Sequence, residues 1–408
     1  DSMRIGIFTD SYPPYINGVS TSIVMLQNAL EKKGHEVFIV TVNAEKLSYK
    51  YENENKIIRI PGIPTGIYDY RLTGIYPLRA IDKIKKWNLD IIHSQTEFGV
   101  GTFARIIAKQ FHIPLVHTYH TMYEDYVHYI THGYFDKSSK KLVEYFTKFY
   151  CDKTASELIV PSKKTYNLFK DKYKCDKNIY IVPTGMDVEN FNRDILDIKK
   201  IQLLKKQYNI AESDFVILFV GRLAQEKNIE FLLNAQVSLQ KKYPELKLLV
   251  VGDGPDHEKY EKIVKKNKLV EKIIFTGAVP RDEMPYYYAL GNVFVTASQS
   301  ETQGLTIIEA MASNLPVVAI DDESFSNIVV SGLNGYLFQK KSDYIKDISL
   351  LIEDKTSYIQ MCKQAKITSL EHSLKYYAEK ILDVYRIAIA KKKKESFLKK
   401  IANKIKRG

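Results

Sequence analysis

The sequence predicts an α/β protein made of two doubly wound, Rossmann-like domains. Short apolar runs alternate with helix-forming segments, and this alternation occurs twice along the chain. The 408 residues, 45% of them hydrophobic, are enough for two cores. The longest apolar runs, 215–220 and 246–251, are far too short to span a bilayer. We therefore expect a globular protein with two domains of similar architecture.

The first domain is predicted over residues 1–186. A strand at 3–10 leads through a loop to a helix at 19–33, which Gly34 closes. The remaining strands are predicted at 35–42, 90–94, 114–117, 157–161 and 179–183. In the loop before the first helix, Gly18 after Asn17 permits close approach of a ligand to the backbone and to free helix N–H groups. A simple tight turn is an equal alternative.

The second domain is predicted over residues 187–372, after a hinge at 183–187 that is rich in turn residues. Its strands are expected at 214–220, 246–252, 273–277, 293–296 and 316–320. Residues 358–390 are predicted to be helical throughout. Within them, 373–390 should pack back on the first domain, and 391–408 should form a separate basic tail.

Two glutamates flank the start of a predicted helix in the second domain. Glu301 lies in the loop after the strand at 293–296, and Glu309 lies about two turns further along the chain. Between them, Gly304, Leu305 and Thr306 supply backbone N–H groups at the helix start. Ligands of open α/β sheets bind at such strand ends. There the two carboxylates can accept hydrogen bonds from two sets of hydroxyls, while the amides bind phosphate. The arrangement suits a sugar nucleotide.

Arg222 and Lys227 follow the first strand of the second domain, on the loop that Gly221 begins. A guanidinium binds phosphate oxygens in a planar bidentate manner, and an ammonium acts as a point charge. Two solvated loop cations would be the ordinary interpretation. Their position at the carboxyl end of a strand favours a diphosphate ligand instead.

Two histidines end the predicted strand at 114–117. His117 and His120 are three residues apart and so should face opposite sides, which disfavours a shared metal. We expect His117 to be structural and His120 to point into a cleft. The glycines at 99 and 101 resemble a dinucleotide fingerprint, but they lack its strand and acid context, so we interpret them as close helix–sheet packing.

The charge of the chain is concentrated at its end. Of a net charge of +12, residues 391–408 carry nine Lys/Arg against Glu395, or +8. Apolar residues on one side (Phe397, Leu398, Ile401, Ile405) face basic residues on the other, which predicts an amphipathic helix on an anionic membrane surface. A disordered solubilising tail is the alternative. A nucleic-acid arm is disfavoured because no reader motif accompanies it.

Two aromatic and basic segments, 61–87 and 119–150, fit the same membrane interpretation, although ordinary core helices would contain many of the same residues. Three scattered cysteines without metal-ligand spacing fit a reducing cytoplasm. The motifs require no metal or other cofactor.

Taken together, the chain resembles the retaining GT-B glycosyltransferases of family 4, and among them the bacterial 1,2-diacylglycerol 3-glucosyltransferases. The resemblance rests on Asn17-Gly18, His120, Gly221-Arg222 with Lys227, the run 252–255 and the Glu301/Glu309 pair. Many relatives have two glycines where this chain has Asn17-Gly18. The family implies a GT-B fold, with two Rossmann-like domains facing a central cleft and a C-terminal helix that crosses back to the first.

The resemblance also implies roles for individual residues. Arg222 and Lys227 would neutralise the UDP diphosphate, and Gly18 would let its loop approach it. Glu309 would bind the ribose hydroxyls, and Glu301 the 3- and 4-hydroxyls of glucose. The amides of Gly304, Leu305 and Thr306 would hold phosphate and sugar, and His120 would contact the sugar.

Three functions remain open from the sequence. The first is transfer of glucose from UDP-glucose to the 3-hydroxyl of 1,2-diacylglycerol, with retention, by a peripheral enzyme at the cytoplasmic face of the membrane. The second is the same catalytic core with a soluble saccharide, a small hydroxy acid or another lipid, such as a phosphoinositide, as acceptor. The third is a non-catalytic binding module. Glucose is not distinguished from galactose.

Overall fold

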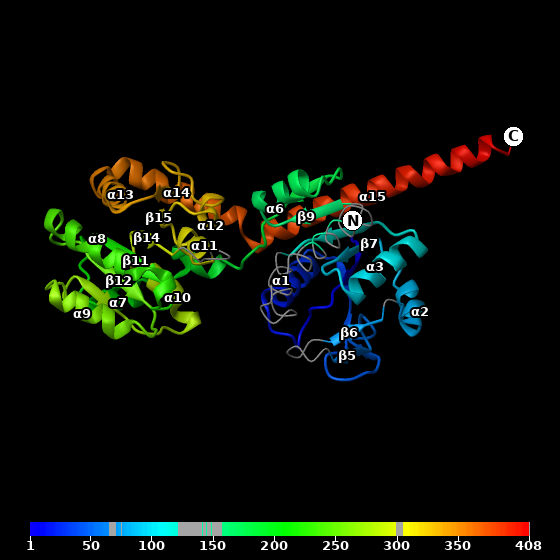
Figure 1. Ribbon diagram of the computed structural model, residues 1–408, viewed down its shortest axis with the longest axis horizontal. Coiled ribbons are helices and arrows are strands. Elements are labelled where there is room, and N and C mark those ends of the chain that lie inside the picture. Colours follow the sequence, from blue (N-terminus) through cyan, green and yellow to red (C-terminus); the bar gives the residue numbers. More distant parts are fainter. Residues whose placement is uncertain are drawn as a thin grey trace. The chain divides into compact units, whose positions relative to one another are not determined.

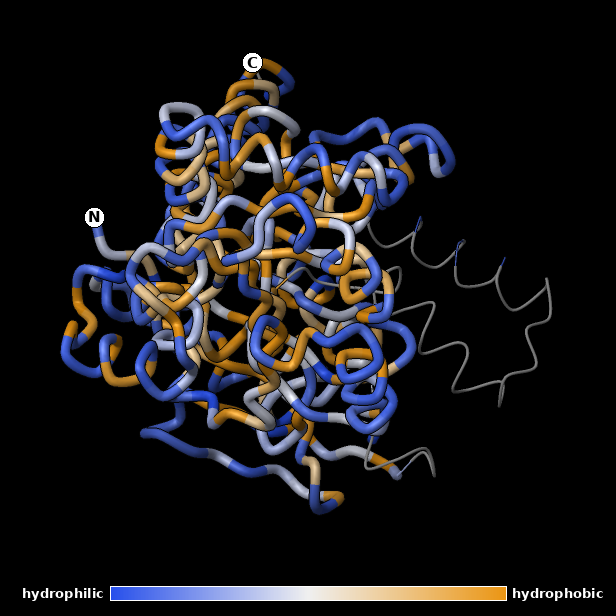
Figure 2. Tube along the Cα trace, turned by 90° about the vertical axis from the view of Figure 1, so that its left-hand side faces the viewer, coloured by the Kyte–Doolittle hydropathy of each residue, from blue (hydrophilic) through white to orange (hydrophobic). Residues whose placement is uncertain are grey.

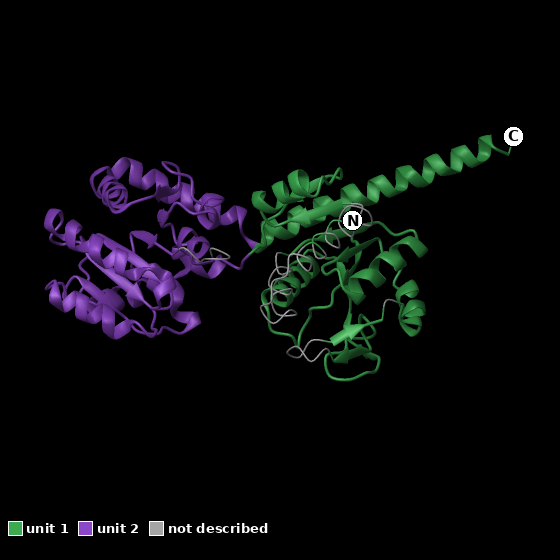
Figure 3. Cartoon of the chain, viewed as in Figure 1, with its two compact units in different colours: residues 1–185, 374–408 green, residues 186–373 purple. Residues whose placement is uncertain are grey.

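The chain folds into two compact units, residues 1–185 with 374–408 and residues 186–373 (Figure 3). The structure is a computed structural model, and it describes residues 1–64, 71–74, 76–120, 157–298 and 305–407, together with 141, 144 and 148.

Unit 1 is built on an eight-stranded sheet of order β10-β9-β8-β7-β1-β2-β4-β3. Its strands are β1 (Arg4–Phe8), β2 (Glu36–Val42), β3 (Lys50–Glu52), β4 (Ile57–Ile60), β7 (Ile91–Ser94), β8 (Leu115–Thr118), β9 (Glu157–Val160) and β10 (Ile179–Ile181). All pair in parallel except β3, which is antiparallel to β4. In the described residues its helices are α1 (Gly18–Lys32), α2 (Leu78–Lys86), α3 (Gly99–Gln110), α6 (Lys163–Asn167), η2 (Leu168–Lys172) and α15 (Leu374–Ile405). Strands β5 (Gly62–Pro64) and β6 (Arg71–Thr73) form a separate hairpin.

Unit 2 is built on a six-stranded parallel sheet of order β13-β12-β11-β14-β15-β16. Its strands are β11 (Val216–Val220), β12 (Lys247–Val251), β13 (Ile273–Phe275), β14 (Val293–Thr296), β15 (Val317–Ile320) and β16 (Gly335–Phe338). Its α-helices are α7 (Ile198–Gln207), α8 (Ile229–Lys242), α9 (His257–Lys266), α10 (Met284–Tyr288), α11 (Leu305–Ala312), α12 (Glu323–Ser326), α13 (Lys341–Glu353) and α14 (Lys355–Glu371). Short 3₁₀ turns are η3 (Glu189–Phe191), η4 (Arg193–Ile195), η5 (Gln225–Lys227) and η6 (Arg281–Glu283).

The central strands are buried along their whole length because helices cover both faces of each sheet. Every residue of β7, β8, β12 and β14 is buried. Hydrophobic residues accordingly gather in the interior, and hydrophilic residues lie toward the outside (Figure 2). This burial explains why apolar runs predicted β11 and β12.

The prediction of one uninterrupted helix over 358–390 is wrong. Helix α14 ends at Glu371, and α15 (Leu374–Ile405) starts after a break at residues 372–373. At the break, the N–H of Met186 donates to the carbonyl of His372 at 3.0 Å, and Met186 also forms a bridge with Ser373. The break lies where the chain leaves unit 2.

Helix α15 has a buried first part and an exposed second part. The first part packs against α1 and contributes Tyr377, Ile381, Tyr385 and Ala388 to the core of unit 1. The second part continues as one helix past the body of its unit (Figure 1). Its apolar residues Phe397, Leu398, Ile401 and Ile405 are at least 40% exposed. The boundary predicted at residue 390 therefore separates packed from unpacked helix without interrupting it.

Lys391 marks this boundary by an ion pair with Glu157 of β9. Its Nζ lies 2.5 Å from Oε1 of Glu157, whose side chain is fully buried, whereas the Lys391 side chain is 47% exposed. The last packed turn of α15 is thus fixed to the sheet by a cation that neutralises an interior carboxylate.

We expect Lys391→Ala to lower the free energy of unfolding by about 1–3 kcal/mol, since it leaves the Glu157 carboxylate buried without its cation. The exposed Lys393 provides a matched control, because Lys393→Ala removes a neighbouring charge of the same helix. Denaturant unfolding of the two variants measures the difference. Equal stability would show that the ion pair contributes nothing.

Of the two aromatic and basic segments, 61–87 is partly buried and partly exposed, and most of 119–150 is not described. In the first, α2 turns Ala80 and Ile84 into the core, whereas Leu72 and Leu78 are 51% and 70% exposed. In the second, residues 121–140 lie outside the described part of the chain. None of the described helices has the length and hydropathy that crossing a bilayer requires.

Candidate functional site

The strand order of unit 2 reverses between β11 and β14, since β12 lies on one side of β11 and β14 on the other. Such a reversal opens a crevice at the carboxyl ends of the two strands, where open α/β sheets bind ligands. Arg222 and Lys227 lie directly after β11, and Glu309 lies on α11, the helix that follows β14. The structure therefore places these three predicted site residues after the two strands of one switch point.

Glycines of the next loop brace the backbone of the Arg222 loop. A Cβ at Gly252, which has φ +135°, would lie 1.9 Å from the carbonyl oxygen of Gly221, and one at Gly254 would lie 2.4 Å from that of Leu223. Because both positions lack a side chain, the N–H of Leu223 donates to Asp253 O at 3.1 Å. Arg222 is exposed on this braced loop, with its side chain available to a ligand.

The loop of Lys227 is tied to the end of β14. Ser298 Oγ donates to the carbonyl of Glu226 at 3.2 Å, so the turn η5 adjoins the segment that leads toward α11. Leu305 and Thr306 are the first two residues of α11, and Leu305 is 42% exposed. Glu301 and Gly304 were also predicted as site residues, and they lie outside the described residues.

Glu309 is a buried carboxylate whose two oxygens differ in their hydrogen bonding. Its side chain is 2% exposed, and Oε1 accepts a hydrogen bond from Nη2 of Arg281 at 2.7 Å. Oε2 is buried and has no hydrogen-bond partner in the described part of the chain. An oxygen of this kind is costly to leave unpaired, which points to a ligand that donates to it.

Arg281 is the residue that the sequence analysis missed. It opens η6 in the loop after β13, its side chain is 72% exposed, and its guanidinium lies 5.9 Å from the ring centre of Phe191. The Glu309 carboxylate raises the pKa of Arg281, so the cation is held firmly charged. A cation just beyond a strand was the available signal, but only the fold shows that it contacts Glu309.

Unit 1 has its own switch point between β1 and β7. Asn17 caps α1 there, its side chain accepting from the N–H of Ser20 at 2.8 Å, and Gly18 is exposed at the first position of the helix. Asp10, at the end of β1, accepts from the N–H of Val100 at 3.0 Å, and burial raises its pKa. Side chains of the protein itself therefore hydrogen-bond to the first-turn N–H groups of α1 and of α3, the helix that contains Val100.

The glycine pair at 99 and 101 serves close packing. A Cβ at Gly101 would lie 1.7 Å from the carbonyl oxygen of Thr96, and one at Gly99 would lie 2.2 Å from Oγ1 of Thr73. These contacts require glycine without any nucleotide.

His117 is fully buried among polar groups. Its Nε2 is hydrogen-bonded to Glu97 and its Nδ1 lies 3.1 Å from Ser94 Oγ. Burial raises the pKa of Glu97 to about 8 and holds that of His117 well below its usual value. Burial thus favours the uncharged form of both groups, a carboxylic acid that donates to a neutral imidazole.

His120 lies two residues beyond β8, and its Nε2 is 2.7 Å from Oε1 of Gln95. Burial lowers its pKa to about 3, so that the ring is neutral at physiological pH. His120 thus offers hydrogen bonding rather than positive charge.

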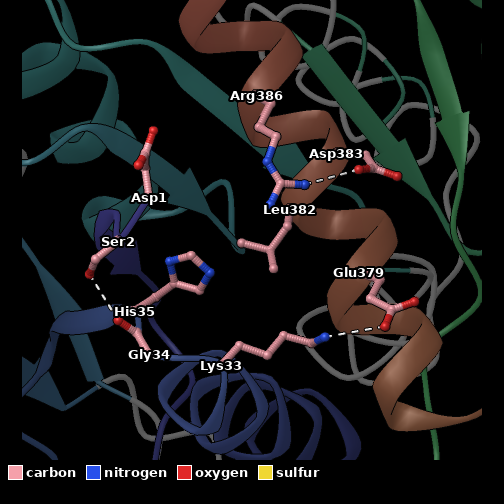
Figure 4. A pocket seen from close by; sticks show the side chains of 9 residues that line it. All are labelled: Asp1, Ser2, Lys33, Gly34, His35, Glu379, Leu382, Asp383 and Arg386. Atoms are coloured by element: carbon pink, nitrogen blue, oxygen red, sulfur yellow. Dashed lines mark hydrogen bonds and ion pairs between the residues drawn. The ribbon is translucent and has the colours of Figure 1, made fainter.

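A surface pocket in unit 1 contains none of the predicted site residues. It is lined by the N-terminus, the turn after α1 and one face of α15, where Lys33 pairs with Glu379 at 3.2 Å (Figure 4). The ion pair of Lys33 with Glu379 joins the end of α1 to α15 at this place.

Comparison with known proteins identifies the family. The model of glycosyltransferase family 4 matches residues 16–190, and that of group 1 glycosyl transferases matches residues 200–368. The alpha-monoglucosyldiacylglycerol synthase of Acholeplasma laidlawii is 35% identical over 96% of this chain and 99% of its own length. The chain belongs to glycosyltransferase family 4. The enzyme of the same name from Streptococcus pneumoniae is 36% identical over 84% of this chain and 76% of its own.

Solved structures agree with this family 4 assignment at the level of fold. Anabaena HepE in complex with UDP has a TM-score of 0.64 at 17% identity, covering 94% of this chain and 99% of that one. Sucrose-phosphate synthase from Thermosynechococcus elongatus has a TM-score of 0.59 at 19% identity, covering 95% and 98%. The predicted GT-B fold, with two parallel-sheet Rossmann-like domains and a C-terminal helix, is confirmed.

Proposed function

We propose that this glycosyltransferase moves glucose from UDP-glucose to the 3-hydroxyl of 1,2-diacylglycerol, with retention of configuration, at an anionic membrane surface. The observation that supports the UDP-glucose donor is the buried Glu309 on the helix after β14: among the described residues, its Oε2 has no hydrogen-bond partner. The names of the two synthases, 35% and 36% identical, support the acceptor half.

In this proposal, each of the following residues binds one part of UDP-glucose. Oε2 of Glu309 accepts from the ribose hydroxyls, while Arg281 holds Oε1. Arg222 and Lys227 stabilise the negative charge that develops on the departing diphosphate. The first amides of α11, at Leu305 and Thr306 with Gly304 before them, bind phosphate oxygens.

The remaining predicted residues contact the sugar or, in the case of Gly18, the diphosphate. Glu301 receives the 3- and 4-hydroxyls of glucose, His120 accepts from another hydroxyl, and Gly18 lets the loop before α1 approach the diphosphate. Retention follows from attack on the same face as departure, a phosphate oxygen of UDP taking the proton of the acceptor hydroxyl. The second part of α15 rests on the membrane, its basic residues near anionic lipid headgroups.

One experiment tests the donor, the acceptor and the stereochemistry together. The purified protein is incubated with UDP-glucose or UDP-galactose and diacylglycerol in mixed micelles of rising anionic lipid content, and the glycolipid and its anomeric configuration are identified by NMR. We expect an α-glucoside that forms faster with more anionic lipid. Turnover that requires a soluble saccharide or hydroxy acid, with no glycolipid, would favour the second acceptor class.

Arg281 gives a sharper test of the donor site. We expect Arg281→Gln to weaken UDP binding by about tenfold, because Glu309 loses the partner that orients its carboxylate. Titration calorimetry with UDP measures this. Lys200→Gln is the matched control, since it breaks an exposed ion pair with Glu283 on the same turn, η6. Equal UDP affinity of the two variants would remove Arg281 from the donor site.

A further inference from the structure

Helix α15 presents different side chains on its two sides where it leaves the body of unit 1. On the packed side, Tyr377, Ile381, Tyr385 and Ala388 belong to the core of the unit, and each is at most 3% exposed. Ile387 lies in the same turn as Tyr385 and Ala388, but it is 37% exposed. The last packed turn therefore already has an apolar side chain on the side that faces away from the core.

The exposed apolar side chains of the second part continue the side on which Ile387 lies. An α-helix has about 3.6 residues per turn, so Ile405 follows Ile387 after about five whole turns and returns to the same side. Ile401 follows the buried Tyr385 after about four and a half turns and so lies opposite to it. We call the exposed apolar residues of this side the outer stripe: Ile387, Phe397, Leu398, Ile401 and Ile405.

The other side of the second part carries charge instead. Steps of about two turns from Tyr385 lead to Lys392, Lys399 and Lys406. The side that is packed in the first part is thus lysine-rich beyond it, and the large apolar residues have changed sides. The second part is therefore a separate amphipathic pattern on the same helix, rather than a continuation of the packing pattern.

The rotation of the second part relative to unit 1 is fixed. Helix α15 runs without a break from Leu374 to Ile405 (Figure 1). At the start of the second part, Lys391 pairs with the buried Glu157 of β9. A flexible tether would let the outer stripe turn in any direction, but a continuous helix holds it on the side that faces away from the core of unit 1.

A lipid surface suits the outer stripe better than a second copy of the chain does. Residues 392–408 carry eight Lys/Arg against one Glu, so two such helices brought together would repel each other. An anionic bilayer attracts these same charges and accepts apolar side chains at the depth of its headgroups.

We propose that α15 lies between unit 1 and an anionic lipid surface, with its outer stripe in the bilayer interface from Ile387 to Ile405. The packed part of the helix then contacts lipid at Ile387, so the membrane holds unit 1 in one orientation. The proposal rests on the membrane contact in the proposed function, and it names the face of the helix and the orientation of the unit.

Single substitutions test the face. We expect Ile387→Ser and Ile401→Ser each to weaken binding to vesicles of equal parts phosphatidylcholine and phosphatidylglycerol about fivefold, because each removes an apolar side chain from the interface. Ile181→Ser is the matched control, since Ile181 lies on β10 of the same unit and is 40% exposed, and it should bind as the parent does. If Ile387→Ser binds like the parent, the packed part of α15 does not contact lipid and the proposal fails.

Insertions after Lys393 test the orientation without changing any charge. Two alanines rotate the rest of the helix by about 200°, whereas four rotate it by about 400° and return it to within about 40° of its register. We expect the first insertion to weaken vesicle binding about tenfold and the second to leave it close to that of the parent. Equal binding by the parent and both variants would show that the segment after Lys393 is an independent tether, and would overturn the proposal.

A fluorescence measurement locates the lipid surface and needs no activity. The chain has one tryptophan, the buried Trp87, so Ile387→Trp adds a single exposed indole. Brominated lipid in the vesicles should quench this variant more than the parent. Equal quenching of the two proteins would refute the contact at Ile387.

Two further outcomes keep the alternatives apart. If the outer stripe pairs two copies of the chain instead, sedimentation without lipid will show a dimer that Ile387→Ser disrupts, and the proposal is wrong. If the parent transfers no glucose, the proposed reaction fails, while the vesicle measurements still decide on which side of α15 the lipid lies.

Discussion

Lys227→Ala is expected to lower kcat by about a hundredfold or more, with stability close to that of the parent. The negative charge that develops on UDP as the sugar–phosphate bond breaks is largest in the transition state, so losing a fixed cation there reduces kcat more than ground-state binding. Lys227 belongs to η5 on the loop after β11, and the contact of Ser298 with Glu226 holds this turn in place. Steady-state kinetics with UDP-glucose provide the measurement.

The control for this prediction is Lys241→Ala. Lys241 is an exposed lysine in the last turn of α8, the helix that begins just after Lys227. It has the same charge and lies in the same unit but away from the switch point, so its removal should leave kcat unchanged. Lys227→Arg should recover part of the loss, since it keeps the charge with a different geometry. A Lys227→Ala enzyme with the kcat of the Lys241→Ala enzyme would exclude Lys227 from the site.

Deleting residues 392–408 is expected to weaken binding to anionic vesicles by about a hundredfold or more at low salt. The deletion removes eight Lys/Arg and one Glu, a net charge of +7, and each cation near an anionic surface contributes about 1 kcal/mol. Lys391 is kept because it pairs with the buried Glu157 and so belongs to the fold. Vesicle co-sedimentation, repeated at rising salt, measures the loss.

Two further measurements show which property of residues 392–408 binds the vesicle and whether the deletion affects the donor site. Replacing Phe397, Leu398, Ile401 and Ile405 by serine keeps every charge and removes the exposed apolar side chains, so it separates insertion from electrostatic attraction. The deleted protein should bind UDP as the parent does, because residues 392–408 include none of the residues proposed to bind the donor. Undiminished vesicle binding by the deletion variant would show that the membrane contact lies elsewhere.

The regular parts of the fold could be predicted from local sequence, and the irregular ones could not. β11 and β12 are continuous apolar runs because both faces of the sheet are covered. β4 escaped prediction because Arg59 interrupts its four residues, and β16 because it begins with Gly335, a residue type that is depleted in strands. The break at residues 372–373 has no glycine or proline to signal it, since a tertiary hydrogen bond to Met186 accompanies it.

For the site, the sequence by itself determined which chemical groups are present and which strand ends carry them: cations after β11, a carboxylate on the helix after β14, and a histidine beyond β8. These follow from local order along the chain. Only the tertiary structure decided that Glu309 is buried with Arg281 on one oxygen, that His120 contacts Gln95, and that His93 contacts Tyr385 of α15. The physical reason is separation: His93 and Tyr385 are 292 residues apart, and no local pattern encodes a contact that only the docking of α15 creates.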